Sequence, residues 1–117
     1  MRRRRGLALR YRALGVIAAN AQGLSGIEKV LLEANPALDL LGACALPVVL
    51  AVEAGMPPEE LVERHRLVAL AAWFADGGME ALVLGCTHFP YFKEALAART
   101  GLPLVDPAEE MLRLLTQ

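Results

Sequence analysis

Short apolar runs alternate along this chain with stretches in which apolar residues recur at helical spacing. Residues 14–19 are apolar without interruption and are bounded by polar residues, as is typical of a strand buried on both faces. Further strands are predicted at 38–43, 80–84 and 102–105.

Helices are predicted between the first strands. Apolar residues recur every three or four positions after Ser25, and Asn35-Pro36 ends this first helix. The apolar segment 47–54 fits either a short helix or an extended segment. Pro57-Pro58 and two glutamates predict the start of a long helix that runs to about residue 75.

Two further helices are predicted near the end of the chain. Pro90 opens one that runs to residue 99, and Asp106-Pro107 is a suitable cap for a last helix at 108–115. Strands that alternate with helices across short connections predict an α/β fold with a parallel sheet of about four strands flanked by helices.

Charge is distributed unevenly. Six of the twelve basic residues lie in the first twelve positions, so residues 1–12 are interpreted as a flexible basic tail and 13–117 as the α/β domain. A basic segment can bind nucleic acid, but four arginines beside the starting methionine fit a solvated tail better, and no nucleic-acid partner is predicted.

The composition, 56% apolar and 21% charged, is that of a folded globular protein. The longest uncharged run, 40–52, is shorter than the ~20 residues of a membrane-spanning helix. The start lacks the features of a signal peptide. We therefore expect no membrane association and a cytoplasmic location.

Cys86 is the residue whose chemistry and position most clearly suggest a functional role. It directly follows a predicted strand and precedes a helix, and ligands of open parallel sheets bind where strands end. Free backbone N–H groups at a helix start favour an anion such as a thiolate. His88 lies two residues further on and can influence the thiol proton.

The other candidates have simpler interpretations. Cys44 is predicted to be core packing, and two cysteines make no disulfide framework. His65 has no second ligand at metal spacing and is expected to be solvated, so no metal site is predicted. Trp73 and Phe74 are expected in the core.

The string Leu84-Gly85-Cys86-Thr87-His88-Phe89-Pro90 closely resembles the second catalytic cysteine segment of glutamate racemases, members of the aspartate/glutamate racemase family. Val52-Glu53-Ala54-Gly55 resembles the acidic segment that precedes it, and Leu104-Val105-Asp106-Pro107-Ala108 resembles the segment that follows. The resemblance extends over roughly residues 12 to 116 and corresponds to the second part of a two-lobed fold.

The resemblance implies a cofactor-independent enzyme that interconverts L- and D-glutamate for peptidoglycan synthesis. Two thiols flank the α-carbon in such a mechanism, so that each acts as base in one direction and acid in the other. By the match, Cys86 is one of the two thiols and His88 tunes it. Thr87 binds substrate, and Glu53 is a nearby acidic site residue.

The Asp-Ser, Pro-Tyr-Gly and Cys-Asn-Thr segments of the family's first half do not occur in this sequence. The implied partner is a separate N-terminal lobe or a second copy of the chain. One alternative is a non-catalytic racemase homologue that acts as a binding or interaction domain. Another is a thiol hydrolase that uses Cys86 and His88.

Overall fold

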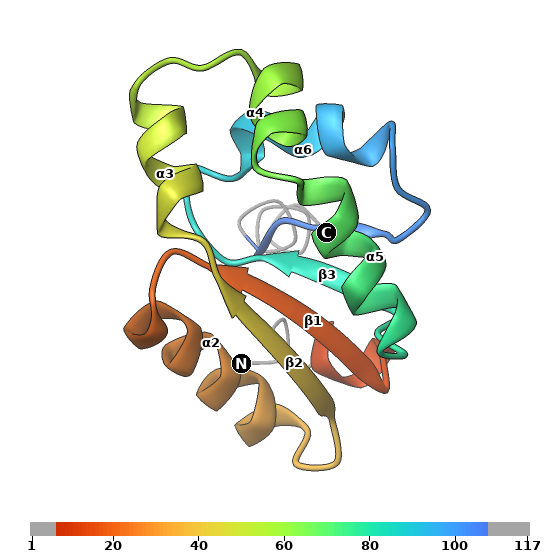
Figure 1. Ribbon diagram of the computed structural model, residues 1–117. Helices are drawn as coiled ribbons and strands as arrows, with labels where there is room; N and C mark the ends of the chain where they lie inside the picture. Colours follow the sequence, from red (N-terminus) through yellow and green to blue (C-terminus); the bar gives the residue numbers. More distant parts are fainter. Residues whose placement is uncertain (1–6, 108–117) are drawn as a thin grey trace, which may run out of the picture.

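A computed structural model, which describes residues 7–107, contains one sheet of four parallel strands flanked by helices (Figure 1). The strands lie in the order β2-β1-β3-β4. Their bounds are Ala13–Ala18 for β1, Asp39–Cys44 for β2, Ala81–Leu84 for β3 and Leu104–Val105 for β4. The predicted α/β class and the parallel sheet of about four strands are confirmed.

The strands end together at one edge of the sheet. Ile17 of β1 pairs with Leu84 of β3, and Ala18 pairs with Cys44 of β2. The residues that follow β1, β2 and β3 therefore emerge side by side, and this carboxyl edge is where a parallel sheet binds ligands.

Five helices connect the strands within the described part of the chain. They are α2 (Ala21–Ala34), α3 (Leu46–Glu53), α4 (Pro58–Arg64), α5 (Leu67–Asp76) and α6 (Pro90–Ala97). In Figure 1, α2 lies on one side of the sheet, whereas α4, α5 and α6 lie on the other. The ambiguous segment at 47–54 is thus helical.

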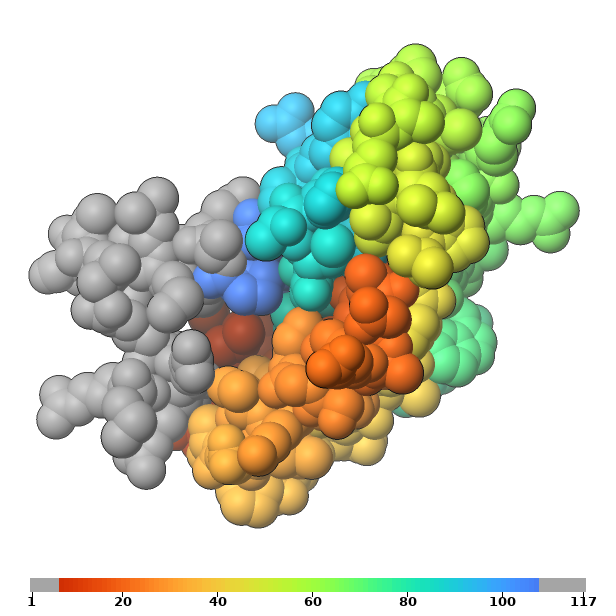
Figure 2. Space-filling model, turned by 90° about the vertical axis from the view of Figure 1, so that its left-hand side faces the viewer, coloured from red at the N-terminus to blue at the C-terminus, as the bar shows by residue number. Residues whose placement is uncertain are grey.

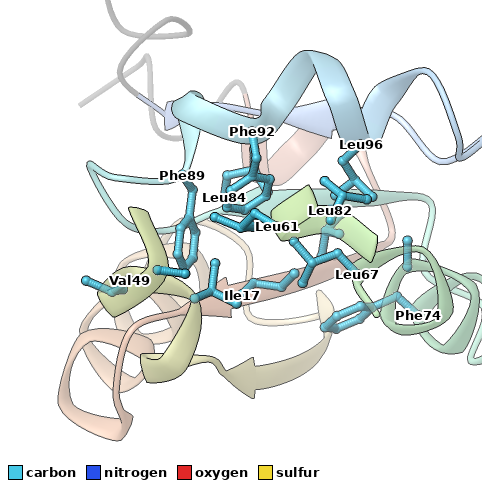
Figure 3. Close-up of a cluster of buried hydrophobic side chains, with 14 of the residues drawn as sticks. Ile17, Val49, Leu61, Leu67, Phe74, Leu82, Leu84, Phe89, Phe92 and Leu96 are labelled. Carbon is cyan, nitrogen blue, oxygen red and sulfur yellow. The ribbon is translucent and has the colours of Figure 1, made fainter. Parts of the chain in front are cut away.

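Alternate residues of the central strands face two separate cores. Ile17, Leu82 and Leu84 point into the larger cluster, which α4, α5 and α6 complete (Figure 3). Leu14 and Val16 face the opposite way and pack with Leu31 of α2. Both faces of β1 and β3 are buried, which explains why their sequences are continuously apolar rather than alternating.

Helix α2 begins four residues earlier than its apolar spacing predicts. Asn20 has extended backbone geometry, and its side chain accepts a 2.8 Å hydrogen bond from the Gly23 N–H. This cap satisfies a backbone donor that the first helical turn leaves unpaired. The predicted start at Ser25 was wrong: Leu24, which packs partly buried against the core that contains Leu14, already belongs to the helix, and of the four helical residues before Ser25 only the first three are exposed.

The long helix predicted at 58–75 is in fact two helices. Its continuity is broken at His65 and Arg66, where Arg66 adopts a left-handed conformation with φ of 53°. This turn changes the direction of the chain, so that Leu61 and Leu67 are both buried in the larger core. The predicted end at about residue 75 agrees with the observed end of α5 at Asp76.

Part of the predicted tail is described by the structure. Residues 7–10 are helical, and Leu7 and Ala8 are buried in the core that contains Leu14. Residues 1–6 and the predicted helix at 108–115 lie outside the described residues. The division into a tail at 1–12 and a domain at 13–117 stays a prediction. Between residues 7 and 107, no helix has the length and apolar content needed to cross a membrane.

Candidate functional site

Cys86 lies at the carboxyl edge of the sheet, two residues beyond the end of β3. Its side chain is half-buried against the larger core, and the thiol is free. Thr87, the next residue, is exposed. The chain thus presents a thiol and a hydroxyl at the place where the fold is expected to bind a ligand.

Gly85 allows the end of β3 to lie close to its neighbours. Its N–H donates a 2.8 Å hydrogen bond to the carbonyl oxygen of Ile17 in β1. A Cβ atom at position 85 would lie 2.4 Å from Ile27 Cδ1 of α2 and 3.0 Å from the Ile17 carbonyl oxygen. A side chain would therefore push the Cys86 turn away from β1 and α2.

His88 lies between the thiol and a carboxylate. Its Nδ1 is 3.8 Å from Cys86 Sγ, and its Nε2 is 3.3 Å from Oε2 of Glu53. Glu53 is the last residue of α3, and it is 33 positions from Cys86 in the sequence. The fold thus brings together three of the predicted site residues. In the neutral tautomer that has its proton on Nε2, the Nε2–H group points at Glu53. Nδ1 then has no proton and can accept a hydrogen bond from the thiol.

The turn between β3 and α6 fixes the direction of both site side chains. The Phe89 N–H donates to the carbonyl oxygen of Cys86 at 3.0 Å, and the Tyr91 N–H donates to that of His88 at 3.3 Å. Phe89 is fully buried, and its ring packs against Phe92. The buried ring anchors the turn, while His88 stays partly exposed beside it.

Two contacts attach the region of α6 to the part of the chain that follows Glu53. The Tyr91 hydroxyl donates a 2.7 Å hydrogen bond to the carbonyl oxygen of Met56, three residues beyond Glu53. At the far end of α6, Arg99 Nη1 lies 2.7 Å from Glu63 Oε2 of α4. Tyr91 was not identified from the sequence, since its partner is a backbone carbonyl that only the folded chain brings near.

Cys44 does not belong to the core, and its predicted packing role was wrong. It is exposed at the end of β2, which is an outer strand of the sheet and has a neighbouring strand on one side only. Cys44 and Cys86 both lie at the carboxyl edge, with β1 between their strands.

The remaining predictions have mixed outcomes. Phe74 is fully buried, as expected, whereas Trp73 is 48% exposed and contacts Phe74 edge-on. Since the two rings are adjacent on a helix, only one of them faces the sheet. His65 is half-buried at the end of α4. Within residues 7–107, no group of three His, Cys, Asp or Glu side chains could hold a metal ion.

Several glutamate racemases are similar in sequence to this chain. The enzyme from Limosilactobacillus reuteri is 33% identical over 106 residues, which cover 88% of this chain and 39% of that protein. The enzyme from Thermus thermophilus is 37% identical over 110 residues, which cover 81% of this chain and 41% of that protein. The chain therefore spans about two fifths of the length of these relatives.

A solved structure is similar over almost the whole fold. The crystal structure of glutamate racemase from Francisella tularensis in complex with D-glutamate superposes with a TM-score of 0.75 and 25% identity. The match covers 98% of this chain and 44% of that one, as expected for one lobe of a larger enzyme. A family model described as Asp/Glu/hydantoin racemase matches residues 5–115. Because that match covers nearly all of the sequence, the chain belongs to the Asp/Glu/hydantoin racemase family.

Proposed function

We propose that this chain provides one of two thiols for the cofactor-independent interconversion of L- and D-glutamate, in the supply of D-glutamate for peptidoglycan. The observation that carries the proposal is the position of His88, with Nδ1 3.8 Å from the Cys86 thiol and Nε2 3.3 Å from the Glu53 carboxylate. We propose glutamate as the substrate because the relatives that the chain resembles are glutamate racemases.

In the proposed reaction, the Cys86 thiolate removes the proton from the α-carbon of one enantiomer. The electron pair of the broken C–H bond is delocalised into the adjacent carboxylate. A thiol on the opposite side of the carbon then donates its proton to that carbon, which inverts it. One proton has left the substrate and one has entered, and the thiol that donated becomes the thiolate for the reverse direction.

His88 and Glu53 act on the thiol rather than on the substrate. With its Nε2 proton directed at Glu53, His88 presents Nδ1 to Cys86 and can accept the thiol proton. The resulting imidazolium lies beside both the thiolate and a carboxylate, and both of these negative charges stabilise it. Thr87, which is exposed beside the thiol, is proposed to donate a hydrogen bond to the substrate.

The proposal is tested by exchange of the glutamate α-proton in D₂O, followed by proton NMR separately for the L and D enantiomers. A single thiol exchanges the proton of one enantiomer without inversion, whereas a complete site exchanges and inverts it. We expect exchange by the wild-type chain, none by Cys86→Ser, and wild-type exchange by the matched control Cys44→Ser. Exchange that survives in Cys86→Ser would exclude Cys86 as the base.

A second candidate function is a non-catalytic interaction domain. It is favoured by the exposure of Leu46 and Leu50 beside the candidate site, because apolar side chains grouped on a surface are typical of protein contacts. Its signature is a wild-type chain that binds a protein partner through this surface but exchanges no α-proton in either enantiomer.

A further inference from the structure

The carboxyl edge of the sheet is nearly free of charge. The segments that run through the ends of β1, β2 and β3 into the following helices, at 18–27, 40–52 and 81–92, contain no Asp, Glu, Lys or Arg. Figure 2 looks onto this edge, where the orange loop after β1, the yellow α3 and the cyan Cys86 turn lie next to one another. A charged residue comes directly after each segment, at Glu28, Glu53 and Lys93. Glu53 lies against His88, and Asp106, which follows β4, is buried.

The opposite edge of the sheet has the usual polar character. Arg12, Asp39 and Glu80 lie at the starts of the first three strands, and all three are exposed. Glu80 accepts hydrogen bonds from the backbone N–H groups of Arg12 and Ala13. Exposed charged residues therefore distinguish the edge at which the strands begin from the carboxyl edge.

Apolar side chains are exposed on the carboxyl edge. Leu46 and Leu50 are 50% and 56% exposed, and their spacing of four residues places them on one face of α3. Cys44 and Pro47 are exposed in the same segment. Depletion of charge at the centre with exposed apolar side chains is the composition of a protein interface.

The proposed chemistry requires something opposite this edge. A proton that leaves one side of the α-carbon must be replaced from the other side, so the two thiols have to face each other across the substrate. Cys44 and Cys86 are not opposed in this way, since both follow from strands of one sheet that end at the same edge, with β1 between them. The second thiol must come from a surface that faces this edge.

We propose that a second copy of the chain provides that surface, in a two-fold symmetric dimer whose carboxyl edges face each other and whose two Cys86 thiols flank one substrate. The inference rests on the proposed function. A two-fold axis through the site places the same thiol on both sides of the α-carbon, and such an arrangement gives a reversible reaction between mirror-image amino acids one acid–base group on each side.

The character of the edge favours a copy of itself as the occupant. In a symmetric interface the same patch meets itself, so a charged patch would be repelled. Here the facing segments are uncharged, and Leu46 and Leu50 of one copy can pack against those of the other. The Glu53 carboxylate lies against His88 of its own copy, with 3.3 Å between Oε2 and Nε2, and this contact limits its repulsion from the second copy.

The first test is sedimentation velocity of the full chain across a concentration series. We expect a monomer–dimer equilibrium, weakened at least about tenfold by Leu50→Glu because a carboxylate would be buried at the interface. The matched control is Leu32→Glu, which changes an exposed leucine on α2 and is expected to leave the equilibrium unaltered. A wild-type chain that remains monomeric, or equal effects of the two variants, would overturn the dimer.

The second test is covalent cross-linking with a short bis-maleimide, in which each thiol adds to one end of the reagent. Cys44→Ser, which retains Cys86, is expected to give a cross-linked dimer, and the yield is expected to fall when Leu50→Glu is added. A dimer that sediments normally but cannot be cross-linked through Cys86 would show that the two thiols do not share a site.

The failure of this inference and the failure of the proposed function give different results. If the chain is a monomer that exchanges the α-proton of one enantiomer only, the thiol assignment is retained and the dimer is rejected. If a Cys86-linked dimer forms but Cys86→Ser still exchanges the α-proton, the proposed function is rejected. Inversion that rises with the fraction of dimer and disappears in Cys86→Ser is the result expected from both.

Discussion

The Tyr91 hydroxyl donates a 2.7 Å hydrogen bond to the carbonyl oxygen of Met56, and so joins the helix that follows Cys86 to the loop that follows Glu53. The two partners are 35 residues apart, and each lies three residues from a member of the His88–Glu53 pair. Side-chain hydrogen bonds to the backbone restrict a loop more than a contact between two flexible side chains does, because one partner is already fixed. Tyr91 therefore holds the spacing between His88 and Glu53.

Tyr91→Phe removes this hydrogen bond and keeps the ring. We expect a loss of about 1 kcal/mol in the free energy of unfolding, the typical net value of one hydrogen bond. Urea denaturation followed by circular dichroism measures it. Cys86-dependent exchange of the glutamate α-proton is also expected to fall. Unchanged stability and exchange would mean that water replaces the phenol at the Met56 carbonyl without loss.

Asn20→Ala removes the cap of α2, whose side-chain oxygen accepts from the Gly23 N–H at 2.8 Å. The expected cost is about 1 kcal/mol of unfolding free energy, because the first turn of the helix loses a hydrogen-bond acceptor. Asn20→Ser is the matched control, since serine caps helices about as well as asparagine. Denaturation midpoints of the three proteins test this, and equal losses in both variants would contradict a capping role.

Arg66→Gly is expected to stabilise the protein. Arg66 has a φ of 53° between α4 and α5, and a left-handed conformation costs a residue with a side chain roughly 1–2 kcal/mol. Glycine avoids that cost, but it gives the unfolded chain more conformational freedom. This added freedom offsets about 0.5–1 kcal/mol of the stabilisation. The net gain should be on the order of 0.5 kcal/mol, the difference between these two effects.

The control for Arg66→Gly is Ala72→Gly, in the exposed face of α5, where glycine has no strain to relieve and costs about 1 kcal/mol. Thermal unfolding of both variants distinguishes the two positions by the sign of the change. Destabilisation of similar size in both would show that the Arg66 side chain contributes more than its backbone costs.

The strands and the position of Cys86 follow from local sequence, because β1 and β3 are buried on both faces and so require continuous apolar runs. A residue just after such a run must lie at the carboxyl edge, whatever the order of the strands. The exposure of Cys44 does depend on that order, because β2 is an outer strand. The sequence around Cys44 does not indicate which strands lie beside β2.

Helix boundaries were less predictable where a single residue determines them. The cap at Asn20 precedes a first turn in which only Leu24 is partly buried, and the break at Arg66 interrupts a pattern that would fit one continuous helix. In the candidate site, Glu53 was associated with Cys86 through family resemblance alone. Their proximity through His88 depends on how α3 and α6 pack, which local sequence does not specify.

Glu53→Gln tests the part of the site that lies farthest from Cys86 in the sequence. Glutamine keeps the shape of the side chain but removes the negative charge beside Nε2 of His88, which lies 3.3 Å away. Without that charge the imidazolium that forms when Nδ1 accepts the thiol proton is less stable. Cys86-dependent exchange of the glutamate α-proton should therefore slow.

The decrease is expected to be on the order of tenfold, below the roughly 100- to 10,000-fold of a group that transfers the proton itself, because Glu53 acts through His88 and is partly exposed. Glu59→Gln removes the same charge from the first turn of α4 and should leave exchange at the wild-type rate. Exchange is measured by proton NMR, with the fold checked by circular dichroism. If Glu53→Gln and Glu59→Gln exchange equally fast, the Glu53 carboxylate does not promote transfer of the thiol proton to His88, and His88 acts without it.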